Sequence, residues 1–350
     1  KYFQHCLFGF FFCVRVFAFF ETTTIMVSSA PVVNIENLLN DRQYMRQTMK
    51  LSDGRQLSYS ESGQPFEQGG EPVLFHFGLM VSSLVVVLFH QEALRQNLNL
   101  VAIDYPGIGE STHLPNRTLT DWPQDVKEFV VAKWGPTTSF ALLANSMGAT
   151  HALYIVADPE IAPRISRWTL VSPWILLPND WLTWMSQTWI PSVVNQTILP
   201  RIITTGTAST LSIAGSMSSL TSDESRQFPS SRNIDITHRI VAYSYHQGQE
   251  GNRQMARLAP KPHKWPESQD AATSNFGIPI WIICGDNDHL VSPESCRKLQ
   301  KLLGDPTLYS TFPRASHNSI FEGIYLTQIF ATLANHPSPD ELPIPDEIPL

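Results

Sequence analysis

Six short apolar segments constrain the fold of this chain more than any other feature of its sequence. Most are separated by stretches with helical periodicity, such as residues 124–133 and 293–303. Buried strands that alternate with helices form a mainly parallel sheet with helices on both faces. Asp53-Gly54, between two alternating segments, predicts a leading hairpin that adds antiparallel strands at one edge. The six predicted strands are residues 73–77, 98–103, 140–144, 168–171, 280–284 and 307–312.

The alternation of predicted strands and helices is interrupted once, between residues 171 and 280. This connection is too long for a single crossover helix and carries helix-like patterns at residues 181–194 and 236–256. We therefore expect an inserted helical cap after the predicted strand at residues 168–171. The expected division is a core of residues 26–175 and 267–335, a cap of residues 176–266, and a poorly ordered Pro- and acid-rich tail of residues 336–350.

Residues 1–25 form a Phe-rich apolar segment that precedes every element of the predicted fold. The segment is similar to a signal-peptide core, but Arg15 interrupts it and it is short for a membrane span. It is interpreted as a signal or anchor, as part of something longer, or as translated sequence upstream of a start at Met26. We favour the third interpretation, which predicts a cytoplasmic protein. A real signal or anchor predicts secretion or membrane attachment, so membrane contact is expected only through this segment.

Charge and metal-ligand patterns argue against several classes of function. The net charge is −7, and the 24 Lys and Arg residues are scattered, whereas nucleic-acid binding needs clustered basic residues. The four cysteines form no Cys-x-x-Cys pair or Cys/His cluster, and the histidines do not fall at metal-ligand spacing. We expect neither a metal site nor a disulfide framework, and no nucleic-acid partner.

The segment around Ser146 changes its period at the serine itself. Residues 140–144 form a predicted strand, and helical spacing begins directly after Met147. A strand that becomes a helix within two residues must turn sharply, which requires small flanking residues, here Ala144 and Gly148. Such a turn strains the backbone and presents a hydroxyl ahead of a helix N-terminus, a suitable place for a nucleophile. On this stretch alone, a simple helix N-cap explains Ser146 equally well.

Two further loops supply the partners that a nucleophilic serine needs. Asp288 follows the predicted strand at residues 280–284, and His317 follows the strand at residues 307–312. A serine hydroxyl needs a base to take its proton, and that base needs a carboxylate to fix its tautomer. The carboxyl ends of parallel strands meet at one sheet edge, so Ser146, Asp288 and His317 are expected to form a triad. Asp286 is the alternative acid.

The chain resembles the α/β-hydrolase superfamily over residues 49–333. The resemblance implies a mostly parallel, eight-stranded sheet with helices on both faces, a cap inserted after strand 6, and no cofactor. It makes Ser146 the nucleophile, Asp288 the acid and His317 the base, with an oxyanion hole formed by the backbone N–H groups of Leu79 and Met147. The matching segments are LSDGRQLSY, FHFGLM, DYPGIGES, ANSMG, IPIWIICGDNDHLVSP and SHNSIFE.

Two positions depart from the family pattern. Phe77 stands before Gly78 where many relatives carry histidine, and Ala144 replaces the first glycine of the serine turn. Neither change removes a backbone donor or a triad residue, and alanine is still small.

We expect a carboxylesterase-like serine hydrolase that cleaves an ester, thioester or amide of a small apolar substrate through an acyl-enzyme. Aromatic residues of the cap, such as Trp181 and Trp184, favour an apolar acyl substrate. The alternatives are a non-catalytic member of the same fold that binds a small ligand, and an acyltransferase or aminopeptidase with the same triad.

Overall fold

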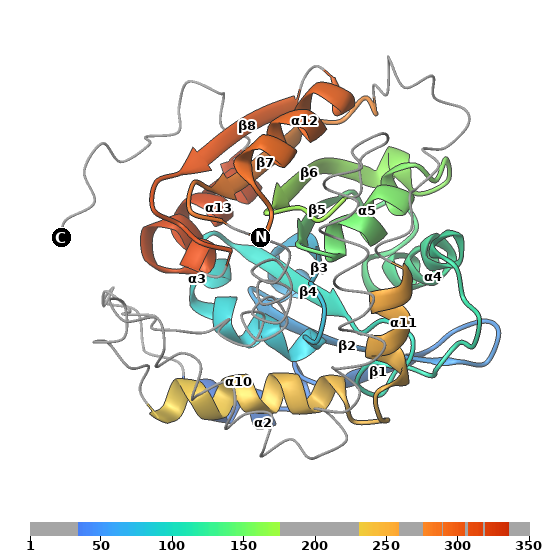
Figure 1. Ribbon diagram of the computed structural model, residues 1–350. Helices are drawn as coiled ribbons and strands as arrows, with labels where there is room; N and C mark the ends of the chain where they lie inside the picture. The colour runs from blue at the N-terminus through green and yellow to red at the C-terminus, as the bar shows by residue number, and fades with distance from the viewer. Residues whose placement is uncertain are drawn as a thin grey trace, which may run out of the picture.

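A central sheet of eight strands organises the computed structural model, which describes residues 34–175, 231–258, 276–288, 290–304, 307–317 and 319–335. Its strand order is β1-β2-β4-β3-β5-β6-β7-β8 (Figure 1). β1 and β2 pair antiparallel, β2 is antiparallel to β4, and all other neighbours are parallel. The strands are β1 (Gln47–Lys50), β2 (Gln56–Gly63), β3 (Glu71–His76), β4 (Leu98–Ile103), β5 (Phe140–Asn145), β6 (Ile165–Val171), β7 (Ile280–Gly285) and β8 (Thr307–Phe312).

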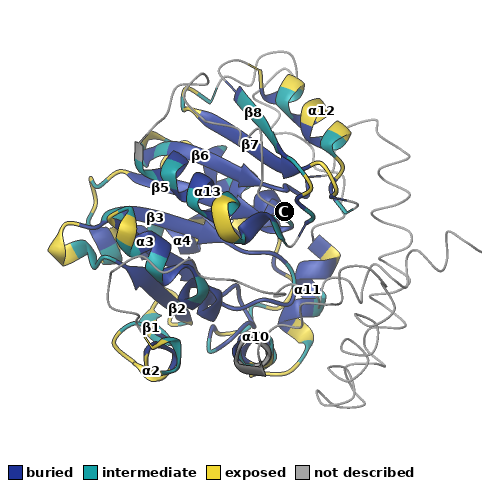
Figure 2. Cartoon of the chain, turned by 90° about the vertical axis from the view of Figure 1, so that its left-hand side faces the viewer, coloured by how far each residue is buried: buried dark blue, intermediate teal, exposed yellow. Residues whose placement is uncertain are grey.

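All six predicted strands are present in this sheet. β4 and β8 have the predicted bounds, β5, β6 and β7 extend the predicted segments by one to three residues, and β3 begins two residues earlier and ends one residue earlier than predicted. Every residue of β4, β5 and β7 is buried because helices cover both faces, which explains why these strands are continuous apolar runs (Figure 2). The predicted hairpin is also confirmed, since β1 and β2 form the antiparallel edge and Gly54 turns between them with φ 88°.

Helices cover the sheet in two layers. α3 and α13 contact each other on one face, and α4 and α5 contact each other on the opposite face (Figure 1). α12 packs against the last two strands, β7 and β8. The helices are α2 (Ile35–Asn40), α3 (His90–Arg95), α4 (Trp122–Trp134), α5 (Gly148–Val156), α10 (Ser231–Ser244), α11 (Glu250–Leu258), α12 (Pro293–Leu303) and α13 (Gly323–Asn335).

The long connection from β6 to β7 contributes α10 and α11 to the described structure. The sequence predicted one helical pattern at residues 236–256, but the structure forms two helices there, separated by a turn in which Gly248 has φ 101°. α10 packs beside η3 (Ser83–Phe89), a 3₁₀ helix in the segment that follows β3. The other predicted cap helix (residues 181–194), the apolar segment of residues 1–25 and the tail of residues 336–350 lie outside the described residues.

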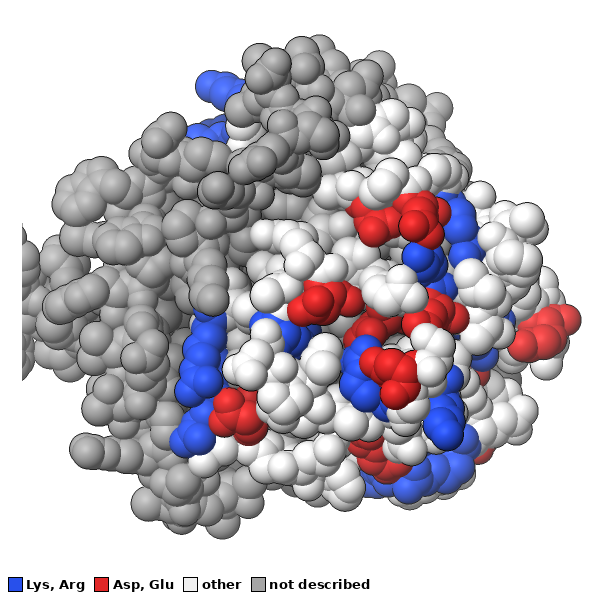
Figure 3. All heavy atoms as spheres, turned by 90° about the vertical axis from the view of Figure 1, so that its right-hand side faces the viewer, with Lys and Arg blue, Asp and Glu red and all other residues white. Residues whose placement is uncertain are grey.

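Acidic and basic side chains are interspersed on the described part of the face that carries α4 (Figure 3). α4 itself carries Lys127, which pairs with Glu160, and Asp125, which pairs with the guanidinium of Arg55. Within the described ranges, no helix combines the length and the apolar character that crossing a bilayer requires.

Candidate active site

Ser146 lies in a strained turn between β5 and α5. Its φ of 51° is in the left-handed region, where a residue other than glycine costs about 1–3 kcal/mol. Two backbone hydrogen bonds hold this conformation: the Ser146 N–H donates to the Val171 carbonyl over 3.2 Å, and the Trp174 N–H donates to the Ser146 carbonyl over 2.9 Å. The Ser146 side chain is partly exposed, so the turn presents its hydroxyl for reaction.

Two glycines allow the end of β3 to approach this turn. A Cβ at Gly148 would lie 2.1 Å from the His76 carbonyl oxygen, and a Cβ at Gly78 would lie 3.1 Å from the Ser146 Cβ. The sequence predicted a small residue at position 148 because the strand and helix of the turn approach each other. In the structure, the segment that a larger side chain at position 148 would clash with is the end of β3, which belongs to neither arm of the turn.

The structure brings Ser146, His317 and Asp288 together into one chain of hydrogen bonds. His317 Nε2 lies 3.1 Å from Ser146 Oγ, and His317 Nδ1 lies 2.8 Å from Asp288 Oδ2. The other Asp288 oxygen, Oδ1, accepts the backbone N–H groups of Leu290 and Val291, each over 2.9 Å. His317 and Asp288 are both buried, and the carboxylate oxygens are engaged from two sides.

This environment favours an ionised Asp288. Burial alone raises the pKa of its carboxyl, but the charge and hydrogen bond of His317 and the N–H of Val291 more than offset burial, and the net pKa lies below its usual value. An ionised carboxylate only accepts hydrogen bonds, so the proton of a neutral His317 resides on Nδ1. The lone pair of Nε2 then faces the Ser146 hydroxyl, as a general base requires.

Asp286, the alternative acid, is exposed, and its backbone N–H donates to the Phe312 carbonyl over 3.0 Å. Two other groups near the end of β3 are buried without joining the triad. Burial lowers the pKa of His76 to about 3, so this imidazole is neutral. Asp104 accepts hydrogen bonds from Ser58 and Ser83, and therefore fixes the start of η3 to β2.

The loop that joins β3 to η3 passes directly beside Ser146. Neither Leu79 nor Met147 donates its backbone N–H to a protein acceptor in the described structure, whereas the Met80 N–H donates to Asn252 Oδ1 over 3.1 Å. Asn252 lies on α11, in the expected cap. Sequence reasoning missed this residue, because no motif or spacing links it to a loop so distant in the chain.

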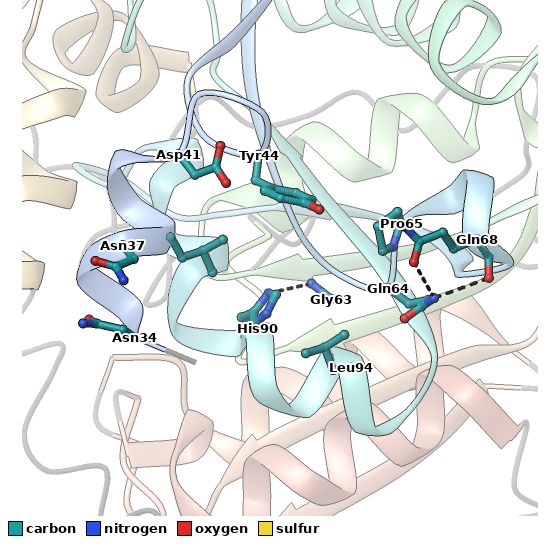
Figure 4. A pocket seen from close by; sticks show the side chains of 11 residues that line it. Asn34, Asn37, Asp41, Tyr44, Gly63, Gln64, Pro65, Gln68, His90 and Leu94 are labelled. Carbon is teal, nitrogen blue, oxygen red and sulfur yellow. Dashed lines mark hydrogen bonds between the residues drawn. The ribbon is translucent and has the colours of Figure 1, made fainter. Parts of the chain in front are cut away.

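A cavity of about 450 Å³ lies elsewhere, between α2, α3 and the connection from β2 to β3 (Figure 4). Its lining includes none of the three residues of the hydrogen-bonded chain. His90 Nδ1 accepts the Gly63 N–H over 3.0 Å, so this histidine is bound to the backbone. Among the residues with described positions, no group of three or more His, Cys, Asp or Glu could hold a metal ion.

Comparison with solved structures finds the same fold in several hydrolases. An esterase from Exiguobacterium antarcticum matches with a TM-score of 0.60 at 16% identity, covering 83% of this chain and 99% of the esterase. An esterase from Rhodococcus sp. ECU1013 matches with a TM-score of 0.57 at 17% identity, covering 82% of this chain and 98% of that chain. A hydrolase from Pseudomonas aeruginosa PA01 matches with a TM-score of 0.57 at 17% identity, covering 83% and 98%.

These identities are low, so the structural matches show the fold alone. They confirm the predicted fold class, an α/β hydrolase with a mostly parallel sheet of eight strands. No curated protein sequence matches the chain. The model of the family described as serine aminopeptidase, S33, matches residues 72–323, which is well over half of the sequence. The chain therefore belongs to this serine aminopeptidase (S33) family of α/β hydrolases.

Proposed function

We propose that this hydrolase cleaves a carboxylic ester through an acyl-enzyme on Ser146. The observation that carries the proposal is the hydrogen-bonded chain from Ser146 Oγ to His317 Nε2 (3.1 Å) and from His317 Nδ1 to Asp288 (2.8 Å). In this proposal Ser146 is the nucleophile, His317 the base and Asp288 the acid that orients it. The non-catalytic alternative is less well supported, because a pocket that only binds a ligand does not need a strained serine beside an oriented imidazole.

In the proposed first step, Ser146 Oγ attacks the ester carbonyl as its proton passes to His317 Nε2. The carbonyl π electrons move to oxygen and give a tetrahedral oxyanion, which the N–H groups of Leu79 and Met147 stabilise. Each such donor typically contributes about 3–4 kcal/mol to transition-state stability. Collapse of the intermediate expels the alcohol, which takes the proton from His317. Water then attacks the acyl-enzyme by the same route and releases the acid.

We further propose that the acyl group is apolar and of medium length. The structural neighbours named as esterases support an ester as the substrate class. The apolar preference rests on cap residues such as Trp181 and Trp184, which lie outside the described residues, so this preference stays a prediction from sequence. The second candidate is an aminoacyl amide, because the matching family is described as serine aminopeptidase. An acyltransferase uses the same triad, and only the acceptor that attacks the acyl-enzyme distinguishes it.

The test combines a fluorophosphonate probe with a panel of chromogenic substrates. The probe is expected to label the wild-type protein and not the Ser146→Ala variant; an unlabelled wild-type protein rejects an activated serine. On p-nitrophenyl acetate, butyrate and octanoate, activity should rise with chain length, because each buried methylene contributes about 0.8 kcal/mol. Equal activity on all three esters rejects an apolar acyl pocket, and preference for aminoacyl p-nitroanilides indicates a peptidase. Faster product formation on adding a simple alcohol indicates acyl transfer.

A further inference from the structure

The loop of residues 78–82 is fixed by groups from the long β6–β7 connection. Met80 has φ 64°, a left-handed conformation that costs energy for a residue with a side chain. The Met80 N–H donates to Asn252 Oδ1 over 3.1 Å. The Met80 carbonyl lies 3.3 Å from Ser244 Oγ, whose single proton is shared with the closer Val241 carbonyl at 2.8 Å. Ser82 Oγ also donates to the Ile240 carbonyl over 2.7 Å. Helices α10 and α11 therefore stabilise the strained conformation of this loop.

Asn252 is the centre of these contacts, and its amide can be oriented in only one way. Its side chain is buried, and its Nδ2 group donates to the Ser244 carbonyl (3.1 Å) and to Ser244 Oγ (3.2 Å). The Met80 N–H needs an acceptor and the Ser244 carbonyl needs a donor, so the network fixes which end of the amide faces which partner. Replacing Asn252 with an apolar residue would leave a buried N–H and a buried carbonyl without partners.

The Leu79 N–H lies in the peptide group between Gly78 and Leu79, so fixed positions of Gly78 and Met80 limit the rotation of this group. Gly78, on the other side of Leu79, packs against Ser146, where even a Cβ would come within 3.1 Å of the serine Cβ. Leu79 is thus the single residue between one anchor at the nucleophile and another at α11. An oxyanion donor is effective only when it already points to the site where charge develops, so small rotations of this peptide weaken it.

We propose that Asn252 is a positioning residue that aims the Leu79 N–H at the oxyanion, so that α11 is coupled to the chemistry of Ser146. The inference rests on the proposed function, because it takes Leu79 as an oxyanion donor. Asn252 itself contacts neither the substrate nor the triad in this account. We expect Asn252 to stabilise the transition state, and therefore to affect kcat, while it contributes little to substrate binding.

The test compares Asn252→Leu with Gln254→Leu. Gln254 is a matched control, because it is another buried amide on α11, but its hydrogen bonds go to Arg117 Nε (2.8 Å) and the Leu114 carbonyl (2.9 Å). On p-nitrophenyl butyrate, we expect Asn252→Leu to lower kcat by about 10- to 100-fold with KM within twofold, since loss of a whole oxyanion donor costs about 10²–10³. Gln254→Leu should stay within about threefold of the wild-type kcat.

A second variant covers the case in which Asn252→Leu does not fold. Asn252→Ala removes the same hydrogen bonds without adding bulk, and should lower kcat by about 10- to 100-fold with KM within about twofold. Equal losses of kcat in the Leu variants at positions 252 and 254 would show that Asn252 only supports the packing of α11. A folded Asn252→Ala protein with kcat within about threefold of wild type would also overturn the proposal.

Hydrogen–deuterium exchange separates failure of this inference from failure of the proposed function. Exchange in the peptide that covers residues 78–82 should speed up in Asn252→Leu and not in Gln254→Leu, whether or not the protein is an esterase. Unchanged exchange in Asn252→Leu overturns the positioning role. Absence of fluorophosphonate labelling in the wild-type protein, with faster exchange in Asn252→Leu, would instead reject the serine hydrolase and keep the loop contact.

Discussion

Asp288→Asn should abolish nearly all of the proposed esterase activity by forcing His317 into the wrong tautomer. The two backbone N–H groups of Leu290 and Val291 donate to Oδ1 of Asp288, and this position must remain an acceptor in the variant. The asparagine amide can satisfy them only with its oxygen there, which turns its NH₂ group toward His317 Nδ1. Nδ1 must then accept a hydrogen bond, so the proton moves to Nε2 and faces Ser146 Oγ. The imidazole then cannot take the serine proton.

The expected loss in kcat is about 10⁴-fold, the size typical of a triad histidine held in the wrong tautomer. This corresponds to about 5 kcal/mol in the activation free energy. KM should change little, because Asp288 is buried behind His317 and does not line a binding surface in this account. The assay is steady-state hydrolysis of p-nitrophenyl butyrate at pH 7.5, with the rate of fluorophosphonate labelling as an independent measure of nucleophile activation.

Asp286→Asn is the matched control for this prediction. It makes the same chemical change two residues away, at an exposed side chain, and should alter kcat by less than twofold. A correctly folded Asp288→Asn protein with more than a tenth of the wild-type kcat would refute the tautomer argument. A larger loss at Asp286 than at Asp288 would mean that the acid of the triad has been misassigned.

Three further predictions concern stability. Ser146→Gly should have a free energy of unfolding about 1 kcal/mol higher than Ser146→Ala, because glycine adopts a φ of 51° without strain. Urea titrations of the two variants measure this difference, and equal stabilities would show that the turn is unstrained. Burial raises the pKa of Asp104 to about 6, so this carboxyl lowers stability as the pH rises from about 4 to 6. Asp104→Asn should remove this loss of stability, which amounts to about 3 kcal/mol of unfolding free energy between pH 4 and 7. If the substitution leaves the pH dependence of the unfolding free energy unchanged, the raised pKa of Asp104 is rejected. Asp125→Ala leaves the largely buried Arg55 without its bidentate partner, and should lower the free energy of unfolding by about 2–4 kcal/mol. Glu160→Gln, at an exposed ion pair with Lys127, should lower it by less than about 0.5 kcal/mol.

The parallel part of the sheet could be predicted from sequence because its strands are buried on both faces. Such strands appear as apolar runs bounded by turns, and β4, β5 and β7 are fully buried along their whole length. The proximity of Ser146, Asp288 and His317 could be predicted for a topological reason, since each follows a parallel strand and the carboxyl ends of these strands share one edge. The sharp turn also explained from sequence why a small residue is needed at position 148, although the sequence could not show that the neighbouring segment is the end of β3.

The helices of the β6–β7 connection were harder to predict because their apolar periodicity continues through a break. Residues 236–256 read as one helix, yet the chain turns at Gly248, where a φ of 101° is easily adopted only by glycine. A single glycine within a helical pattern is often tolerated, so the pattern alone does not reveal the turn. The partners of Asn252 on the β3 loop depend on this turn, because it folds α11 back toward Ser244.

The loop of residues 78–82 illustrates which kind of information the sequence lacked. Gly78 is held at Ser146, Met80 at Asn252, and Ser83 at Asp104, whose two carboxylate oxygens accept the Ser83 N–H over 2.6 Å and the Ser83 hydroxyl over 2.8 Å. These three anchors come from the serine turn, from α11 and from the end of β4, and each is a tertiary contact without a local pattern. The strained φ of Met80 persists because the neighbouring residues are fixed on both sides, so stability from three distant segments is used to hold one peptide group in place. Preorganisation of this kind is what the stabilisation of a developing negative charge requires.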